Sequence, residues 1–304
     1  MDNGTCSPQA PEYASFSLGE WTGLTLMRGA CAGTPAAPPI EWKWLERLVS
    51  DRGTLPGLRI LKTSETVDIF EVRLPRGLDQ DPLRVICKQT NTRGVKDGLA
   101  GLVRPSAARR NFERAKALQS ARIGTALPLA YLERKSPRAS WLITEYLEGV
   151  VDLDAYVLTV LSRSSTAIRQ DRRVAIISAL VGLCRGLERA GLYHRDLKAS
   201  NILLANVQLD PPRVFIVDLD GLNPTRPWRS AWKPMTRLAA SLLQYSGVSS
   251  ADYARFLREY LVADGQSSRA WRSHFHRLRK QAARYSQAAQ NRKTKKLDGY
   301  AGDS

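Results

Sequence analysis

The amino-acid sequence predicts an α+β protein with two lobes, a small lobe built on an antiparallel sheet with one helix and a larger, mainly helical lobe. The first observation is a series of segments within residues 58–88 in which apolar and polar side chains alternate, as in half-buried strands. The second is a stripe of apolar residues at helical spacing over residues 171–190. The third is the stretch 193–204, in which a charged turn leads directly into an apolar strand.

Composition limits the classes of protein that fit. A chain of 304 residues can bury a substantial core. Its 46 Lys and Arg against 29 Asp and Glu give a formal charge of +17, which favours an anionic partner such as a nucleotide, a nucleic acid or an acidic membrane surface. Four scattered cysteines without a C-x-x-C pair, together with three histidines, indicate neither a zinc cluster nor a disulfide framework. We therefore expect reduced thiols and a cytoplasmic protein.

Membrane spans and targeting segments are not predicted. No apolar run approaches the roughly 20 residues that a transmembrane helix needs. The chain begins without a basic segment followed by an apolar core, so no signal peptide is expected. Any contact with a membrane should be peripheral.

The small lobe follows an N-terminal extension, residues 1–57, which contains an Ala-, Gly- and Pro-rich linker and a short helix over 41–49. Trp42 and Trp44 of that helix are expected to pack a core, and a ligand-binding surface is the alternative interpretation. A helix is predicted over 106–122, with Ser106 as its N-cap and Gly124 as its stop. The predicted strands of this lobe are 58–61, 67–74, 83–88, 127–133 and 141–146.

The large lobe begins near residue 148. The predicted divisions are the N-terminal extension over 1–57, the small lobe (N-lobe) over 58–147, the large lobe (C-lobe) over 148–285 and a basic tail over 286–304. A long helix is predicted over 171–190, ended by Gly191. Val214–Val217 forms a fully apolar strand that ends at Asp218. Further helices are predicted over 152–161, 235–245 and 252–262.

The strongest chemical signal is the stretch Tyr193–Leu204, which contains H-R-D-L-x-x-x-N. This pattern is typical of the catalytic loop of protein kinases and their relatives. In that chemistry Asp196 orients the acceptor hydroxyl and accepts its proton, Lys198 contacts the transferred phosphate, and Asn201 binds magnesium. A kinase-like fold without activity is the alternative interpretation of the same residues.

Other residues complete the expected set. Asp218 follows an apolar strand about twenty residues after Asp196, where kinases place their principal metal-binding aspartate, although such a residue can also cap a turn. Lys88 ends the third strand and is expected to reach the α- and β-phosphates of ATP. Glu113 is the only acidic residue between Asp97 and Glu133, and we expect it to form the ion pair that aims Lys88.

The nucleotide-binding segment can be placed by position alone. Trp141–Gly149 is interpreted as a buried strand that runs into the connection between lobes, where backbone groups of Glu145 and Leu147 would hold adenine. The turn over residues 62–66 contains no glycine, whereas the phosphate-covering loop of kinases is rich in glycine. Hydroxyl groups of Thr63 and Ser64 would have to replace some backbone contacts.

With these positions assigned, the chain resembles the bacterial lipopolysaccharide-core kinases, the Kdo and heptose kinases of the protein-kinase-like superfamily. The resemblance covers roughly residues 58–285. It rests on Val85–Lys88, Arg104–Glu113, Ile123–Ala130, Leu142–Leu147, the Asp218-Leu219-Asp220 variant and Arg255–Leu261. It implies a bilobal protein-kinase-like fold, ATP and magnesium as cofactors, and an anionic sugar or glycolipid as acceptor.

The segment after Asp218 favours a sugar acceptor independently of the resemblance. Only residues 222–234 separate Asp218 from the next helix, and no A-P-E sequence closes a peptide-binding segment. Aromatic rings stack on sugars and guanidinium groups pair with carboxylates or phosphates, although ordinary packing and solvated charge remain open for each residue. The residues in question are Arg226, Trp228, Arg229, Trp232 and Lys233.

The C-terminal run 269–296 contains ten basic residues and no acidic one, with aromatic and apolar side chains between them. A basic amphipathic helix of this kind can lie on an anionic membrane. Nucleic-acid binding is the less favoured interpretation, and a solvated helix is a third. The leading functional hypothesis is thus a lipopolysaccharide-core kinase. The alternatives are a bacterial Ser/Thr protein kinase, which Arg195 permits, and a non-catalytic nucleotide-binding protein.

Overall fold

The computed structural model describes residues 11–27, 40–76, 80–91, 105–135, 138–161, 166–208, 211–225, 232–245, 247–262 and 271–301. By its internal contacts the chain divides into two compact units. The first comprises Met1–Lys116 and Ala126–Leu147, and the second comprises Ala117–Thr125 and Glu148–Ser304. The first unit is built on a sheet and the second is mainly helical, which confirms the predicted α+β class.

The first unit contains one seven-stranded antiparallel sheet in the order β1-β2-β6-β7-β5-β4-β3. All five strands that the sequence predicts for this lobe are present, with ends shifted by a few residues. The strands are β1 Glu12–Leu18, β2 Trp21–Met27, β3 Arg59–Thr63, β4 Val67–Arg76, β5 Gln80–Asn91, β6 Pro128–Arg134 and β7 Ala139–Glu145.

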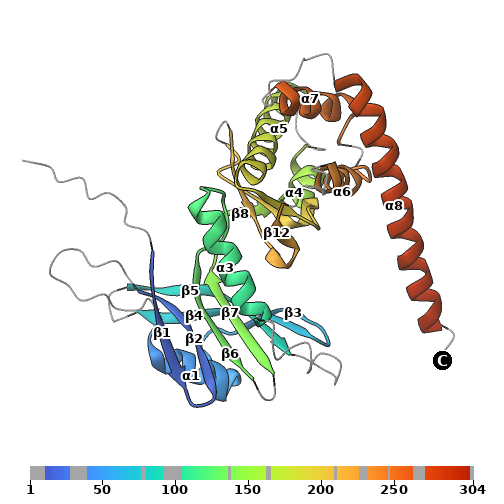
Figure 1. Ribbon diagram of the computed structural model, residues 1–304. Helices are drawn as coiled ribbons and strands as arrows, with labels where there is room; N and C mark the ends of the chain where they lie inside the picture. The colour runs from blue at the N-terminus through green and yellow to red at the C-terminus, as the bar shows by residue number, and fades with distance from the viewer. Residues whose placement is uncertain are drawn as a thin grey trace, which may run out of the picture. The chain divides into compact units, whose positions relative to one another are not determined.

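The two faces of this sheet have different cores. Helix α1 (Trp42–Ser50) covers one face, where Trp44, Leu45 and Leu48 join a large cluster with alternate residues of the strands. Helix α3 (Ala107–Ser120) covers the other face through Ala108 and Phe112 (Figure 1). Because side chains alternate along a strand, neighbouring buried positions of a strand contribute to different cores on the two faces.

The hairpin formed by β1 and β2 was not predicted from the sequence. It extends the sheet beyond β6 by pairing Thr22–Thr25 with residues of that strand. The close pairing requires Gly23, because a Cβ at this position would lie 1.9 Å from the carbonyl oxygen of Tyr131. Part of the N-terminal extension therefore belongs to the sheet of the first unit.

A buried carboxylate ties the β3, β4 and β5 strands together on the α3 face. Glu71 is 2% exposed and accepts hydrogen bonds from Arg84 (2.6 Å) and Arg59 (2.6 Å). The hydrogen bonds from Arg84, together with those from Arg59, lower the pKa of Glu71 although burial opposes the shift. Arg84 also stacks on Tyr146, 3.7 Å from the ring centroid, at the start of the segment after β7.

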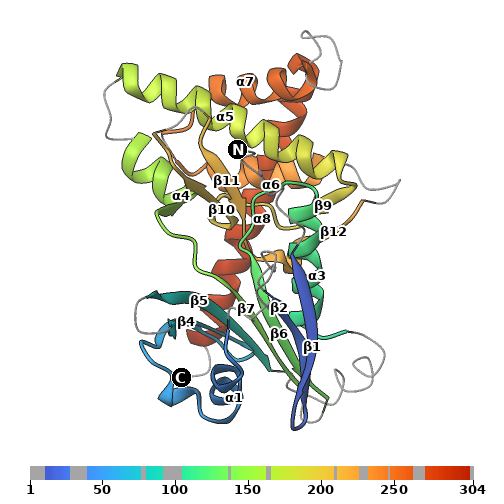
Figure 2. The same ribbon diagram turned by 90° about the vertical axis from the view of Figure 1, so that its left-hand side faces the viewer.

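The second unit consists of two short sheets and several helices (Figure 2). Its three-stranded sheet has the order β11-β10-β8, and β12 pairs with β9 in a separate two-stranded sheet. Helix α5 packs along α7, and α8 packs on both α6 and α7. The elements are β8 Val150–Asp152, α4 Leu153–Tyr156, the π-helical turn η2 Val157–Leu161, α5 Thr166–Arg189, β9 Leu192–His194, β10 Ile202–Ala205, β11 Arg213–Ile216, β12 Leu222–Pro224, α6 Trp232–Leu242, α7 Ser250–Val262 and α8 Trp271–Ala301.

Two of the three predicted helix ends are confirmed. Ser106 caps α3 by accepting a hydrogen bond from the Arg109 amide at 3.0 Å, and Gly191 follows α5 with a φ of 65°. The prediction that Gly124 ends α3 is wrong, because Arg122 adopts the left-handed conformation with a φ of 56°. Gly124 is needed for another reason. Its Cα lies against β11, where a Cβ would be 2.1 Å from the carbonyl oxygen of Val214.

Helix α8 is continuous from Trp271 to Ala301, so residues 286–301 extend this helix where the sequence analysis expected a tail. Leu278 and Ala282 are each 1% exposed, and α8 packs on α6 and α7. Exposed basic side chains occupy other positions of the helix, namely Arg272, Arg277, Arg279, Lys280 and Arg284. Within the described residues, no helix combines the length and apolar character needed to cross a bilayer.

Candidate functional site

The stretch from His194 to Ile202 is held by backbone pairing on both sides. The β9 strand pairs with β12, and the Arg195 amide donates to the Gly221 carbonyl at 2.7 Å. The Ala199 amide donates to the Ser241 hydroxyl of α6 at 2.9 Å. Leu197 and Ala199 are fully buried and anchor the loop, whereas the side chains of Asp196 and Lys198 stay accessible.

Three sequence-predicted residues meet in this loop. The Asp196 carboxylate is 40% exposed, and its Oδ2 lies 3.6 Å from Lys198 Nζ. The Asn201 amide donates from Nδ2 to the Asp196 carbonyl at 3.0 Å. The loop thus places a carboxylate, an ammonium group and an amide together within one turn of chain, as the motif predicts.

Asp218 is joined to the same loop through main-chain contacts. The Val217 amide donates to the Asn201 carbonyl at 3.0 Å, and Asp218 itself adopts a left-handed conformation with φ 57° and ψ 59°. This conformation is strained for a residue other than glycine, and such strain is frequent at functional sites. Asn201 and Asp218 are therefore held in adjacent segments of the second unit.

His194 stabilises the turn at Asp218 through a hydrogen bond to its main chain. Its Nε2 donates to the Asp218 carbonyl at 3.1 Å, and the ring is fully buried. Burial lowers the pKa of His194, although the Asp218 carbonyl opposes the shift, so the imidazole is neutral at neutral pH. Gly221 allows this contact, because a Cβ there would lie 2.7 Å from the His194 ring.

The donor set of Asn201 and Asp218 fits magnesium. Magnesium prefers oxygen ligands and is usually held by one or two protein groups together with substrate phosphates and water. Asn201 uses Nδ2 in its hydrogen bond, so the Oδ1 acceptor of the same amide would bind the ion. Among the residues that the structure describes, no three His, Cys, Asp or Glu side chains gather into a cage that would hold a metal by protein ligands alone.

Lys88 projects from the first unit's sheet on its α3 face. It lies in β5 opposite Leu142 of β7, and Leu142 packs against α3. Glu113 lies on α3 with its carboxylate 3.5 Å from Lys116 Nζ and its side chain 51% exposed. Lys116 is thus the ion-pair partner of Glu113 in this structure, and the pair with Lys88 stays a prediction.

The segment after β7 is constrained at Glu145. Its amide donates to the Leu127 carbonyl at 3.0 Å, and its Oε1 accepts from the Leu127 amide at 2.8 Å. Because the Glu145 amide is used, an adenine contact at this residue would involve its carbonyl oxygen. Leu147 is the last residue of the first unit, where backbone contact with adenine was predicted.

The turn between β3 and β4 is closed by a hydroxyl. The Ser64 hydroxyl accepts from the Val67 amide at 3.1 Å and donates to the Val67 carbonyl at 2.8 Å. The Ser64 hydroxyl is therefore occupied in stabilising the turn.

Of the residues predicted to face a sugar, Arg226, Trp228 and Arg229 lie outside the described part of the chain.

Two charged neighbours of this loop were not predicted from the sequence. Arg237 of α6 lies with its Nη1 3.2 Å from Asp196 Oδ1, although the residues are 41 positions apart. The positive charge of Lys198 acts on the carboxylate of Asp154 in α4. Burial raises the pKa of Asp154, whereas a hydrogen bond from Tyr245 and the charge of Lys198 oppose this. Single charged residues on helices give no sequence signal for such contacts.

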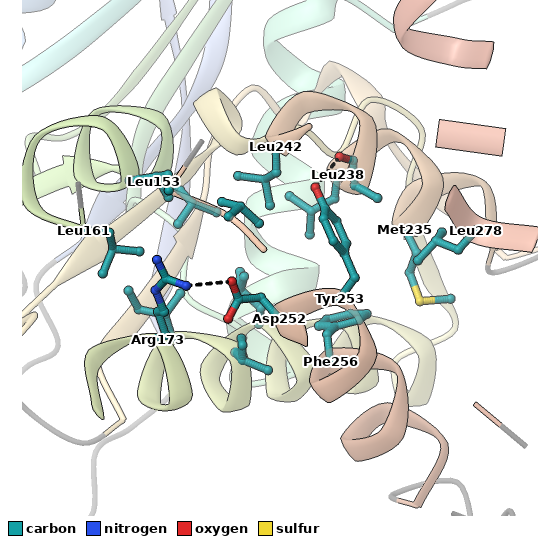
Figure 3. A pocket seen from close by; sticks show the side chains of 17 residues that line it. Leu153, Leu161, Arg173, Met235, Leu238, Leu242, Asp252, Tyr253, Phe256 and Leu278 are labelled. Carbon is teal, nitrogen blue, oxygen red and sulfur yellow. Dashed lines mark hydrogen bonds and ion pairs between the residues drawn. The ribbon is translucent and has the colours of Figure 1, made fainter. Parts of the chain in front are cut away.

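An apolar cavity of about 80 Å³ lies among the helices of the second unit (Figure 3). An ion pair between Arg173 and Asp252, 3.1 Å apart, is its main charged feature. None of the catalytic-loop residues lines this cavity, so it is a feature of the helical core. The residues labelled in the figure are Leu153, Leu161, Arg173, Met235, Leu238, Leu242, Asp252, Tyr253, Phe256 and Leu278.

Comparison with solved structures identifies a related fold. A solved structure described as WaaP in complex with acyl carrier protein has a related fold, with 20% sequence identity and a TM-score of 0.57. The match covers 78% of this chain and 90% of that chain. A search of curated protein sequences gives no significant match.

The family assignment comes from the sequence of residues 87–260, which is more than half of the chain. This region matches the description "Lipopolysaccharide kinase (Kdo/WaaP) family" and includes Lys88, Asp196, Asn201 and Asp218. The match confirms the resemblance predicted from the motifs. The chain therefore belongs to the lipopolysaccharide kinase (Kdo/WaaP) family.

Proposed function

We propose that this protein transfers the γ-phosphate of ATP to a sugar hydroxyl of the lipopolysaccharide inner core, on Kdo or heptose, in a magnesium-dependent reaction. The observation that most supports this proposal is the spatial arrangement of Asp196, Lys198 and Asn201 in the catalytic loop. Asp196 has an accessible carboxylate beside Lys198, and its carbonyl is held by Asn201, the predicted magnesium ligand. Family membership supports the general class of phosphotransferase.

Each residue has a distinct role in the proposed reaction. Asp196 accepts a hydrogen bond from the acceptor hydroxyl, aims its oxygen at the γ-phosphorus and takes the proton as the bond forms. Lys198 offsets negative charge on the transferring phosphoryl group. Lys88 binds the α- and β-phosphates. Magnesium held by Asn201 and Asp218 would supply positive charge at the phosphate oxygens.

The choice of a sugar acceptor rests on the short segment between β12 and α6. A protein kinase needs a long activation segment to bind an extended peptide, and this chain has only residues 225–231 between those elements. Incubation with ATP, magnesium and core oligosaccharide should therefore add phosphate to the sugar. Labelling of serine or threonine in peptides would instead support the protein-kinase alternative.

Replacing Asp218 with asparagine should remove magnesium-dependent ATP binding. A ligand at about 100 times its Kd stabilises a protein by about 2.7 kcal/mol, so MgATP should raise the Tm of the natural sequence by several degrees. In the variant the shift should fall to that given by ATP with a metal chelator, because one ligand charge is lost. Differential scanning fluorimetry checks this.

The matched control is Asp171→Asn, which neutralises an exposed carboxylate on α5. It should keep the full MgATP shift. A natural-sequence protein with no shift at any ATP concentration would support the non-catalytic alternative, and an unchanged shift in the Asp218 variant would contradict the metal assignment.

We also propose that α8 brings the enzyme to an anionic membrane surface on the cytoplasmic side, where a lipid-linked acceptor would be presented. Its apolar residues Leu278 and Ala282 are buried within the second unit, so the contact would be electrostatic through exposed basic residues. Each Lys or Arg near an anionic surface contributes about 1 kcal/mol. Nucleic acid is a less favoured partner for the same charges.

Replacing Arg272, Arg277 and Lys280 together with glutamine should weaken binding to anionic vesicles about 100-fold, because about 3 kcal/mol of attraction is removed. Sedimentation with vesicles of phosphatidylglycerol and phosphatidylcholine measures this. High salt should likewise weaken the binding of the natural protein to these vesicles. Equal binding to pure phosphatidylcholine vesicles would contradict the proposal.

A further inference from the structure

Arg237 is placed against the catalytic loop by helix α6. Its Nη1 lies 3.2 Å from Asp196 Oδ1 and also donates to the Arg195 carbonyl. The guanidinium group thus binds the side chain of one loop residue and the main chain of its neighbour. A single rigid group with two such contacts fixes a carboxylate better than an ordinary surface ion pair, which leaves both side chains free to rotate.

Helix α8 also contacts Arg237. The Arg237 guanidinium lies over the Tyr285 ring, with its carbon 5.0 Å from the ring centroid. The two helices are locked together nearby, where Trp232 stacks on His274 with ring centroids 4.7 Å apart and Leu278 is buried. Arg237 therefore contacts both an aromatic ring and the catalytic loop.

The two oxygens of the Asp196 carboxylate have different environments. Oδ1 accepts the hydrogen bond from Arg237, whereas Oδ2 lies 3.6 Å from Lys198 Nζ. A separation of 3.6 Å gives electrostatic attraction but is too long for a hydrogen bond. Oδ2 consequently keeps its capacity to accept a hydrogen bond, which is what an acceptor hydroxyl requires.

We propose that Arg237 is a positioning residue of the phosphoryl-transfer site, which fixes Asp196 through Oδ1 and presents Oδ2 to the acceptor hydroxyl. Tyr285 orients Arg237, so α8 contributes to the catalytic geometry. This inference rests on the proposed function, since it assigns Asp196 the acceptor hydroxyl. Arginine is required because lysine is a point charge that cannot pair with Asp196 and lie flat on Tyr285 together.

The test is steady-state phosphoryl transfer by Arg237→Ala, with ATP, magnesium and core oligosaccharide. Because a misplacement of about 1 Å can cost 10²-fold, kcat should fall roughly 10- to 100-fold. The KM for ATP should change less than about twofold, because Arg237 acts on Asp196 and not on the nucleotide in this account. Added guanidinium chloride at millimolar concentration should restore part of kcat, and Arg237→Lys should be less active than the natural sequence.

Two comparisons separate positioning from general support of the fold. The control Arg255→Ala removes a partly exposed arginine of α7 that pairs with Glu259, and it should keep kcat and lack any response to guanidinium. Tyr285→Leu should lower kcat by about 2- to 5-fold, the value of a cation–π contact, whereas Tyr285→Phe keeps the ring and should restore it. Natural kcat in Arg237→Ala, with Asp196→Asn inactive, would overturn the inference.

A measurement without substrate separates this inference from the proposed function. Urea unfolding of Asp196→Asn, Arg237→Ala and the double variant forms a double-mutant cycle. Non-additive unfolding constants support the Arg237–Asp196 contact, and additive ones overturn the inference even if the natural protein transfers no phosphate to the chosen acceptor. Absence of transfer to every sugar acceptor, in contrast, counts against the proposed function itself.

Discussion

Replacing Asp196 with asparagine should lower kcat for phosphoryl transfer by about 10²- to 10⁴-fold, the usual contribution of general acid–base catalysis. The amide has nearly the same shape, so the loop should keep its fold. It cannot take the proton of the acceptor hydroxyl, and it loses the charge that attracts Arg237 (3.2 Å) and Lys198 (3.6 Å). Transfer of labelled phosphate under saturating ATP measures the effect.

The Asp196 variant should still bind MgATP, because the expected metal ligands Asn201 and Asp218 are unchanged. The Tm shift with MgATP should therefore match that of the natural sequence, while Asp171→Asn should keep both activity and shift. An Asp196→Asn enzyme with more than about a hundredth of the natural kcat would contradict the assigned role, since loss of a catalytic base costs at least about 10²-fold.

Replacing Gly124 with alanine should destabilise the second unit by about 3 kcal/mol, the upper part of the range for overpacked sites. The new Cβ would lie 2.1 Å from the Val214 carbonyl oxygen, and neither atom belongs to a flexible side chain. The Gly124 carbonyl also accepts from the Ile216 amide at 2.8 Å, so separating the segments would disturb β11, two residues before Asp218. Urea unfolding followed by circular dichroism measures the loss.

Replacing Gly182 with alanine is a control that should raise the stability, whereas the same change at Gly124 should lower it. Gly182 lies within α5, and a Cβ there would meet no atom within 4 Å. Alanine at an unobstructed helical position stabilises a protein by roughly 0.5–1 kcal/mol relative to glycine. Gly182→Ala should therefore shift the urea midpoint upward. Equal midpoints for Gly124→Ala and the natural sequence would contradict the close approach of residue 124 to β11.

The sequence predicted those parts of the fold that depend on local patterns. Alternation over 67–74 and the apolar run 214–217 gave strands, and Ser106 gave the start of α3, because each signal lies within a few residues. The motif around Asp196 predicted its neighbours Lys198 and Asn201 for the same reason. Contacts within one turn of chain can be inferred from spacing alone.

Contacts between distant segments could not be predicted in this way. The β1–β2 hairpin pairs with β6 more than a hundred residues later, and its strand β1 is only partly buried, so it shows weak patterning. Gly124 looks like a helix stop, yet its small size serves the approach to Val214. Arg237 resembles any helical arginine until α6 places it beside Asp196. Each of these depends on packing that a single sequence does not display.

The most direct test of the central claim is to follow the γ-phosphate of labelled ATP in a reaction that contains the protein, magnesium and lipopolysaccharide core oligosaccharide. Mass spectrometry of the products identifies the molecule that receives the label. The natural sequence should place phosphate on a sugar hydroxyl, and Asp196→Asn should place none there. Label found only on serine or threonine side chains, or an acceptor phosphorylated equally by Asp196→Asn, would contradict it.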